Sequence, residues 1–159
     1  MQLTTCTRAA CTAVATVLAV LVCALLPAPA SATPAGAGAR LIIPRLKLDD
    51  PVGSQLSQGP AFYPSSARPG QPDTVAIAGH RTTHTHPFWS LNLLRRGDAI
   101  KVVWHGRPHT YRVTSTRVVA PTDWSLVRSR GYERLILSTC TPRFSARERL
   151  IVTALPAKS

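Results

Sequence analysis

Apolar residues of this chain fall into short runs that turn-forming residues separate. Val, Ile and Thr are frequent in these runs, which cover residues 41–48, 74–78, 100–104, 110–119, 134–139 and 150–155. Tyr111 and Val113 alternate with Arg112 and Thr114, which is the period of a strand with one buried face. Turn formers stand between the runs, at 51–53, 68–70, 96–98, 106–108 and 121–123. The pattern predicts a mostly β domain whose short strands form a closed or nearly closed barrel.

Only two segments of the domain have a pattern that allows a helix. One lies near residues 88–94, and the other is a turn near residues 123–128. Asp123 is of the residue type that caps the start of a helix. We therefore expect one or two short helices beside the strands.

The first forty residues differ from the rest of the chain. Arg8 is followed by an uncharged stretch that runs to Ala39. Its most apolar part, residues 9–26, would span about 27 Å as a helix, slightly less than a hydrocarbon core of about 30 Å. The Ala-Ser-Ala segment at 30–32 has the small-x-small form that signal peptidase cuts. We expect residues 1–32 to be either a cleaved signal peptide or a retained N-terminal membrane anchor.

Beyond this leader the sequence predicts a short linker and one domain. Residues 33–39 are rich in Ala, Gly and Pro, which is typical of a flexible tether. Residues 40–157 are enough for a single compact core. Both interpretations of the leader predict export, to the outer face of the cytoplasmic membrane or to the cell wall.

The net charge of +12, with only seven acidic residues, favours polyanionic surroundings. Anionic lipid and acidic wall polymer fit an exported protein, and nucleic acid does not. A coding bias towards arginine is the alternative explanation of the charge.

Cys140 is the only cysteine beyond the leader, which contains Cys6, Cys11 and Cys23. Exported proteins usually pair their thiols, so a single one indicates a reactive thiol or an intermolecular bridge. A buried structural thiol is a third interpretation. A nucleophilic thiol must be ionised, and because a free cysteine has a pKa of about 8.5, it needs a cation or base nearby.

His80 is the histidine best placed to be that base. It follows the apolar run 74–78 after Gly79, which puts an imidazole at a strand end. His84 and His86 lie in a polar loop that we expect to face solvent. A satisfied strand-end histidine is the plainer interpretation of His80. A zinc site that combines these three histidines with His105 or His109 is a further alternative, although a loop offers it no fixed geometry.

An acyl-transfer site also needs a donor for the oxyanion, and a guanidinium is a permanently charged candidate. Arg143, Arg147 and Arg149 all follow Cys140 closely. Arg149 directly precedes the run 150–155, so a rigid strand would hold it beside the strand that carries Cys140. The alternative is that Arg149 is a solvated charge and Arg147 takes its role.

Together these residues resemble the signature of the sortase family. Leu137-Ser138-Thr139-Cys140, followed by Arg149-Leu150-Ile151-Val152, is similar to the sortase active-site motif. The segment 76–81, Ala-Ile-Ala-Gly-His-Arg, is similar to the histidine segment of the same family. The resemblance extends from Leu41 to Leu155 and is greatest to the class E sortases of high-GC Gram-positive bacteria.

The resemblance implies an eight-stranded sortase-type β-barrel and a cysteine transpeptidase, for which we expect no cofactor. Some sortases depend on calcium, but the acidic residues of this chain are scattered, so we expect no metal site. In this mapping Cys140 attacks the threonine carbonyl of a C-terminal sorting signal and cuts the Thr-Gly bond. His80 transfers the protons, and Arg149 binds the oxyanion. Class E sortases favour Leu-Ala-x-Thr-Gly over Leu-Pro-x-Thr-Gly signals.

The same resemblance suggests substrate contacts and partners. Tyr63 is expected at the second signal position, Thr139 and Arg147 are further candidates for substrate binding, and the loop 120–133 is the expected specificity element. The partners would be surface or pilin proteins that carry the signal, and the acceptor an amine of a peptidoglycan precursor or a pilin. A thiol peptidase that mainly hydrolyses its substrate and a non-catalytic, basic wall-binding barrel are the alternatives.

Overall fold

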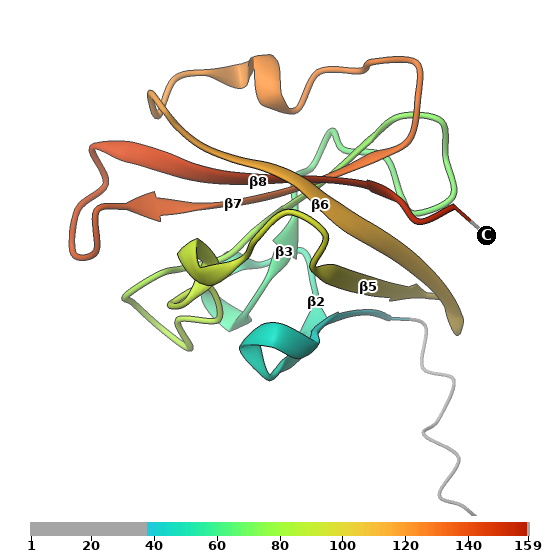
Figure 1. Ribbon diagram of the computed structural model, residues 1–159. Coiled ribbons are helices and arrows are strands. Elements are labelled where there is room, and N and C mark those ends of the chain that lie inside the picture. Colours follow the sequence, from blue (N-terminus) through green and yellow to red (C-terminus); the bar gives the residue numbers. More distant parts are fainter. Residues whose placement is uncertain (1–37, 159) are drawn as a thin grey trace, which may run out of the picture. The chain divides into compact units, whose positions relative to one another are not determined.

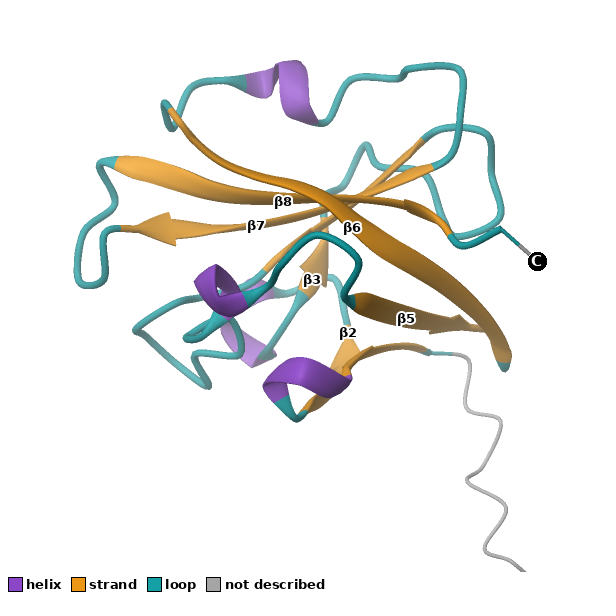
Figure 2. Ribbon diagram, viewed as in Figure 1, coloured by secondary structure: helices purple, strands orange, loops and turns teal. Residues whose placement is uncertain are grey.

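Eight strands form a single sheet in the computed structural model, which describes residues 38–158 (Figures 1 and 2). They are β1 (Ala39–Ile43), β2 (Leu48–Val52), β3 (Ala61–Phe62), β4 (Thr74–Ala78), β5 (Ala99–Trp104), β6 (Arg107–Val119), β7 (Arg134–Thr141) and β8 (Glu148–Pro156). Helical structure is limited to 3-10 turns, namely η1 (Pro44–Leu46), η2 (Leu56–Gln58), η3 (Leu91–Leu93) and η4 (Trp124–Leu126). The prediction of a mostly β, eight-stranded domain with only short helices is confirmed.

The sheet curls until its two edges meet. Its strand order is β2-β1-β5-β6-β8-β7-β4-β3, and β4 and β7 are the parallel neighbours. The backbone N–H of Gly53 donates to the carbonyl of Pro60 at 2.9 Å, and that of Phe62 donates to the carbonyl of Gly53 at 3.0 Å. These bonds join the end of β2 to β3, so the edge strands lie side by side and the barrel is nearly closed.

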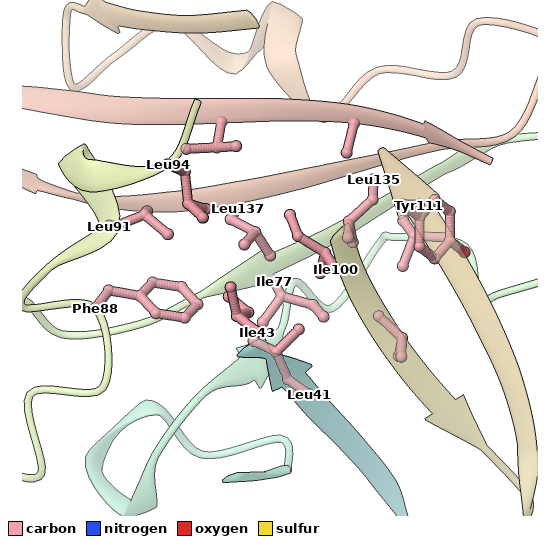
Figure 3. Packing of buried hydrophobic residues seen from close by; sticks show 14 of the residues in the cluster. Leu41, Ile43, Ile77, Phe88, Leu91, Leu94, Ile100, Tyr111, Leu135 and Leu137 are labelled. Atoms are coloured by element: carbon pink, nitrogen blue, oxygen red, sulfur yellow. The ribbon is translucent and has the colours of Figure 1, made fainter. Parts of the chain in front are cut away.

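The barrel interior is filled by the inward-facing residues of alternate strand positions. Leu41, Ile77, Ile100, Leu135 and Leu137 have no exposed surface, and they gather between the strands with Phe88 and Tyr111 (Figure 3). Ala76, Ile136 and Ile151, on the outward-facing side of β4, β7 and β8, form a second, smaller apolar cluster with Leu126 of η4. The loop 120–133, orange at the top of Figure 1, covers this second face and carries η4.

Two predicted strand boundaries are wrong, each because of a proline. The run 41–48 is two strands, since Pro44 opens η1 and Lys47 turns the chain at a φ of 52°. The turn expected at 51–53 is the end of β2, where Pro51 pairs with Arg40. Pro51 is tolerated there because β2 is an edge strand, which leaves one side of the backbone without a ladder.

The turn expected at 106–108 is shorter than predicted. His105 and Gly106 have positive φ angles of 47° and 77° and form the hairpin turn between β5 and β6. Pro108 already lies in β6, opposite Val103. The pairing of β6 with β8 begins only at Tyr111, so Pro108 has no second neighbour that needs its missing N–H.

The two helical predictions are confirmed as short turns. The segment 88–94 contains η3, and the segment 123–128 contains η4. The Asp123 carboxylate accepts the backbone N–H of Ser125 at 3.0 Å and caps η4 as expected. No helix within residues 38–158 has the length and apolar character to cross a membrane. The leader, 1–32, and residues 33–37 of the linker lie outside the described residues, and β1 begins at Ala39.

Candidate active site

Cys140 and Arg149 face each other across two neighbouring strands. Cys140 is the penultimate residue of β7, Arg149 is the second residue of β8, and the antiparallel register pairs them directly. Directly opposed residues have Cβ atoms about 4.5–5.5 Å apart on the same face of a sheet. Cys140 is a free thiol and is partly exposed. The two side chains therefore start from adjacent positions, at the end of β7 and the beginning of β8, which lie at the left of Figure 1.

His80 follows β4 at the same end. Ala78 is in register with Ser138 of β7, and the backbone N–H of Gly79 continues this pairing to the Ser138 carbonyl at 3.0 Å. Because β4 and β7 run in parallel, His80 stands two residues beyond Ala78 as Cys140 stands two residues beyond Ser138. The structure thus brings His80, Cys140 and Arg149 to the ends of three adjacent strands, β4, β7 and β8.

The surroundings of His80 favour a neutral imidazole. Burial lowers the pKa of His80, and the nearby charge of His84 lowers it further. The two rings stack with their centroids 4.4 Å apart. On the other side, Nδ1 of His80 is 3.0 Å from the Thr83 hydroxyl, which fixes the orientation of the ring. His84 and His86 are exposed, as the sequence predicts.

The guanidinium of Arg149 is held by its own loop. Its Nη1 donates to the carbonyls of Ala146 and Glu148 at 3.0 and 3.1 Å. Nε and Nη2 have no hydrogen-bond partner within residues 38–158 and remain able to donate. Arg147 is exposed, and its backbone N–H donates to the Ser145 hydroxyl at 3.2 Å.

A cavity of about 180 Å³ lies between the outer face of the sheet and the loop 120–133. Its lining includes Tyr63, Trp124, Leu126, Ile136, Ser138 and Arg149. Ile136 and Ser138 alternate along β7 with the buried Leu137, so they share the face that carries Cys140 two residues further on. The cavity, called the groove below, therefore lies over the face of β7 that also carries Cys140.

Buried polar contacts hold the outer wall of this groove in place. Nε of Arg134 donates to the Thr74 hydroxyl, and its Nη2 donates to the Leu126 carbonyl, both at 2.9 Å. The Thr74 hydroxyl donates in turn to the Arg128 carbonyl at 2.9 Å. The loop 120–133 is thus tied to the starts of β4 and β7.

Two of the predicted substrate-binding residues occupy different faces of the sheet. Tyr63 lines the groove, and its hydroxyl donates to the Ser138 hydroxyl at 3.3 Å. Thr139 faces the opposite side and is 3 % exposed, and its hydroxyl donates to the Gly79 carbonyl at 2.7 Å. This bond ties the residue before His80 to the residue before Cys140. Substrate contact by Tyr63, Thr139 or Arg147 stays a prediction.

Sequence reasoning missed Ser138 and Arg81. The period of two along β7 was a signal for Ser138, because it puts that residue on the same face as Cys140. Arg81 is a charged residue in a polar loop, a position that predicts exposure, yet it is buried beneath the site. Across residues 38–158 no three His, Cys, Asp or Glu side chains are placed to hold a metal ion, so the zinc alternative has no ligand set there.

Known proteins that are similar to this chain are sortases. Residues 41–157 match the family model of the sortase domain. The chain is 29 % identical over 145 residues to Sortase SrtE1 of Streptomyces coelicolor, an alignment that covers 78 % of this chain and 41 % of that protein. It is 28 % identical over 108 residues to Sortase D of Bacillus subtilis, which covers 64 % of this chain and 53 % of that protein.

Solved sortase structures share the same barrel. Sortase C-1 from Actinomyces oris matches with a TM-score of 0.71 and 28 % identity, over 76 % of this chain and 74 % of that one. A lid mutant of Sortase A from Corynebacterium diphtheriae matches with a TM-score of 0.71 and 26 % identity, over 77 % of this chain and 71 % of that one. The family model covers most of the chain, and the chain therefore belongs to the sortase family.

Proposed function

We propose that this protein cuts the Thr-Gly bond of a C-terminal sorting signal and transfers the threonyl group to an amine at the cell wall. The observation that supports this most strongly is the placement of His80, Cys140 and Arg149 at the ends of three adjacent strands. A nucleophile, a proton carrier and an oxyanion donor in one rigid frame suit acyl transfer.

In the first half of the reaction the Cys140 thiolate attacks the threonine carbonyl carbon and forms a C–S bond. The carbonyl oxygen takes up the electron pair, and the free N–H groups of Arg149 donate to this oxyanion. When the tetrahedral intermediate collapses, the C–N bond breaks and the His80 imidazolium protonates the departing glycine amine. The threonyl group is left as a thioester on Cys140.

In the second half an amine attacks the thioester. Neutral His80 accepts the proton that the amine loses, the C–S bond breaks, and the thiolate is restored. The lowered pKa of His80 suits this base step, because it keeps the imidazole neutral near pH 7. The acid step uses the minor fraction of molecules that hold thiolate and imidazolium together, which predicts a bell-shaped dependence of rate on pH.

The groove is the proposed site for the residues that precede the threonine. Its lining combines apolar side chains with the Tyr63 and Ser138 hydroxyls, and it includes Arg149, which pairs with Cys140 across β7 and β8. An extended Leu-Ala-x-Thr-Gly segment fits this mixture, with Tyr63 near the alanine. Surface or pilin proteins with such a signal are the proposed substrates. A peptidoglycan precursor or a pilin supplies the acceptor amine on the outer face of the membrane.

Hydroxylamine distinguishes transfer from hydrolysis. The full chain is incubated with a Leu-Ala-x-Thr-Gly peptide with and without hydroxylamine, and the released products are identified by mass spectrometry. We expect hydroxylamine to accelerate release and to give a threonyl hydroxamate. Release at an unchanged rate, with a free threonine carboxylate as the only product, would assign the protein to the hydrolytic thiol peptidases instead.

A further inference from the structure

Arg81 lies directly after His80 in the chain and contacts the strand end that carries Cys140. Its Nη1 donates to the Thr141 hydroxyl at 2.7 Å and approaches the Cys140 carbonyl at 3.4 Å. Its Nη2 donates to the Asn92 side-chain carbonyl in η3 at 3.0 Å. One guanidinium thus joins three segments: the start of the His80 loop, the end of β7 and η3.

Arg81 is buried without a counter-ion. The residue is 7 % exposed, and its Nε is buried with no hydrogen-bond partner. The ion pairs within residues 38–158 are Arg40 with Asp49 and Arg45 with Asp98, so no carboxylate neutralises Arg81. Burial and the charge of Arg143 both lower its pKa. A buried, unpaired charge destabilises a fold, so stability alone does not explain this side chain.

The shape of the guanidinium explains what the position gains. Its donors lie in a fixed plane, and two of its nitrogens bond groups on different segments at once. A lysine ammonium at this position is a point charge without that fork. The contacts of Arg81 therefore fix the positions of the segments that it joins, and this role depends on the geometry of its donors more than on its positive charge.

We propose that Arg81 is a positioning residue that sets the distance between His80 and Cys140. Arg81 follows His80 directly in the chain, and its guanidinium donates hydrogen bonds to the Cys140 carbonyl and the Thr141 hydroxyl. This inference rests on the proposed roles of His80 and Cys140. A displacement of about 1 Å between reacting groups can cost about 100-fold in rate. Hydrogen bonds that link the His80 loop to the end of β7 therefore bear directly on the rate of proton transfer.

The test compares chemistry that needs both groups with chemistry that needs the thiol alone. In the full chain, Arg81→Met removes the tie while keeping an unbranched side chain. Transfer from the Leu-Ala-x-Thr-Gly peptide to hydroxylamine gives kcat and KM. Iodoacetamide labelling of Cys140, followed on the tryptic peptide 135–143, reports the ionisation and accessibility of the thiol without proton transfer to or from a substrate. That peptide contains Cys140 and none of the leader cysteines.

We expect kcat for Arg81→Met to fall by about tenfold or more, with KM and the labelling rate within about threefold of the wild type. Thr141→Val removes the hydroxyl acceptor and keeps the guanidinium, so it tests the same contact if Arg81→Met fails to fold. For Thr141→Val we expect a fall in kcat of at least about threefold.

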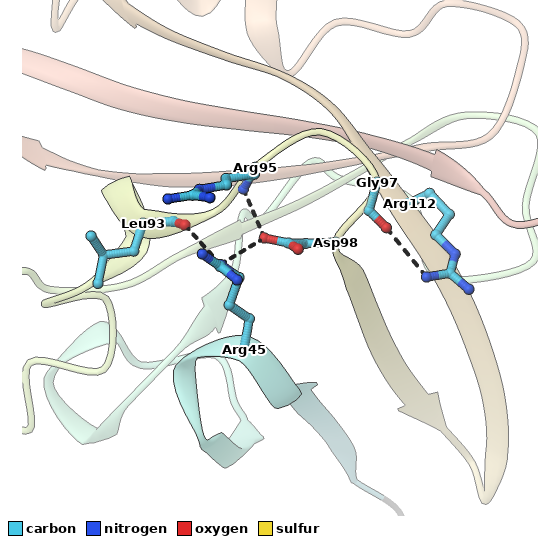
Figure 4. Close-up of polar contacts among 6 residues, drawn as sticks. All are labelled: Arg45, Leu93, Arg95, Gly97, Asp98 and Arg112. Atoms are coloured by element: carbon cyan, nitrogen blue, oxygen red, sulfur yellow. Dashed lines mark hydrogen bonds and ion pairs between the residues drawn. The ribbon is translucent and has the colours of Figure 1, made fainter.

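Arg45→Met is the matched control. Arg45 also bonds η3, through the Leu93 carbonyl at 3.1 Å, and it pairs with Asp98 at 3.2 Å, but it contacts neither His80 nor Cys140 (Figure 4). Its kcat is expected to stay within twofold of the wild type, about the scatter of such comparisons.

Two results overturn the inference. One is an unchanged kcat in folded Arg81→Met or in Thr141→Val. The other is a parallel fall of kcat and of the labelling rate, which would mean that the substitution acts on the thiol itself, through its ionisation or its access, and not on its distance from His80. Cys140→Ala separates the inference from the proposed function. If Cys140→Ala still transfers the peptide, the proposed function fails, whereas an inactive Cys140→Ala beside a fully active Arg81→Met refutes the role of Arg81 alone.

Discussion

At the scale of single residues, the two candidates for the oxyanion donor, Arg149 and Arg147, differ in their position and hydrogen bonds. Arg149 uses one nitrogen for the carbonyls of its own loop and keeps two others available. Arg147, two positions earlier, is exposed and sits in the loop before β8. The register places Arg149, and not Arg147, opposite Cys140. The strand frame therefore favours Arg149 as the oxyanion donor.

Replacing Arg149 tests this assignment. We expect Arg149→Met to lower kcat/KM for the Leu-Ala-x-Thr-Gly peptide by about 100-fold to 1,000-fold, the usual cost of losing one oxyanion donor. Arg147→Met is measured alongside it and should have the smaller effect. The reverse order of the two variants would move the oxyanion role to Arg147.

His84 adds to the effect of burial in lowering the pKa of His80. Burial and the charge of His84 lower the pKa of His80, so removing His84 raises that pKa towards its ordinary value. In His84→Ala the acidic limb of the pH profile of kcat/KM should therefore move to higher pH. The rate at the optimum should also rise, because more molecules then hold the imidazolium beside the thiolate.

His86→Ala is the control for this measurement. His86 lies in the same loop but packs against Trp89, with ring centroids 5.8 Å apart, and not against His80. Its acidic limb should coincide with that of the wild type. A shift of the limb to lower pH in His84→Ala would contradict the assigned cause.

At the scale of elements, the junction between β4 and the His80 loop depends on a close approach of backbone and side chain. A Cβ at Gly79 would stand 2.7 Å from Cγ of Phe88, which is fully buried in the barrel core. Both backbone polar groups of Gly79 also bond to β7: its N–H donates to the Ser138 carbonyl, and its carbonyl accepts from the Thr139 hydroxyl. The backbone there has no freedom to move away from the Phe88 ring.

Gly79→Ala should therefore destabilise the domain. We expect the free energy of unfolding to fall by about 1–3 kcal/mol, the range of overpacked cores, as measured by urea denaturation. Gly53→Ala is the matched control, since a Cβ there meets no heavy atom closer than 3.9 Å. Equal stability of the two variants would show that Phe88 gives way without cost.

At the scale of the whole molecule, the sequence predicts the long strands well, because period-two alternation marks them, as Tyr111 and Val113 do in β6. It misses β2 and β3. Pro51 makes the end of β2 look like a turn in the sequence. β3, Ala61–Phe62, has only two residues and is too short to show a period. β2 pairs with β1 and β3 pairs with β4, and the bonds of Gly53 to Pro60 and Phe62 then close the barrel.

The candidate site likewise contains residues that the sequence indicates and residues that it does not. His80, Cys140 and Arg149 are visible in the sequence, because each stands at the end of an apolar run. Arg81 and Arg134 are not, since an arginine is normally expected in solvent. Only the tertiary fold supplies the carbonyl and hydroxyl oxygens that accept from their guanidinium groups.

The central claim is that Cys140 carries the substrate as a thioester. Its most direct test is mass spectrometry of the full chain quenched in acid during turnover of a Leu-Ala-x-Thr-Gly peptide, with digestion to the peptide 135–143. We predict an added mass equal to that of the substrate peptide up to its threonine less one water, located on Cys140 and removed by hydroxylamine. Turnover of the peptide without any adduct on Cys140, or turnover retained in Cys140→Ala, would contradict it.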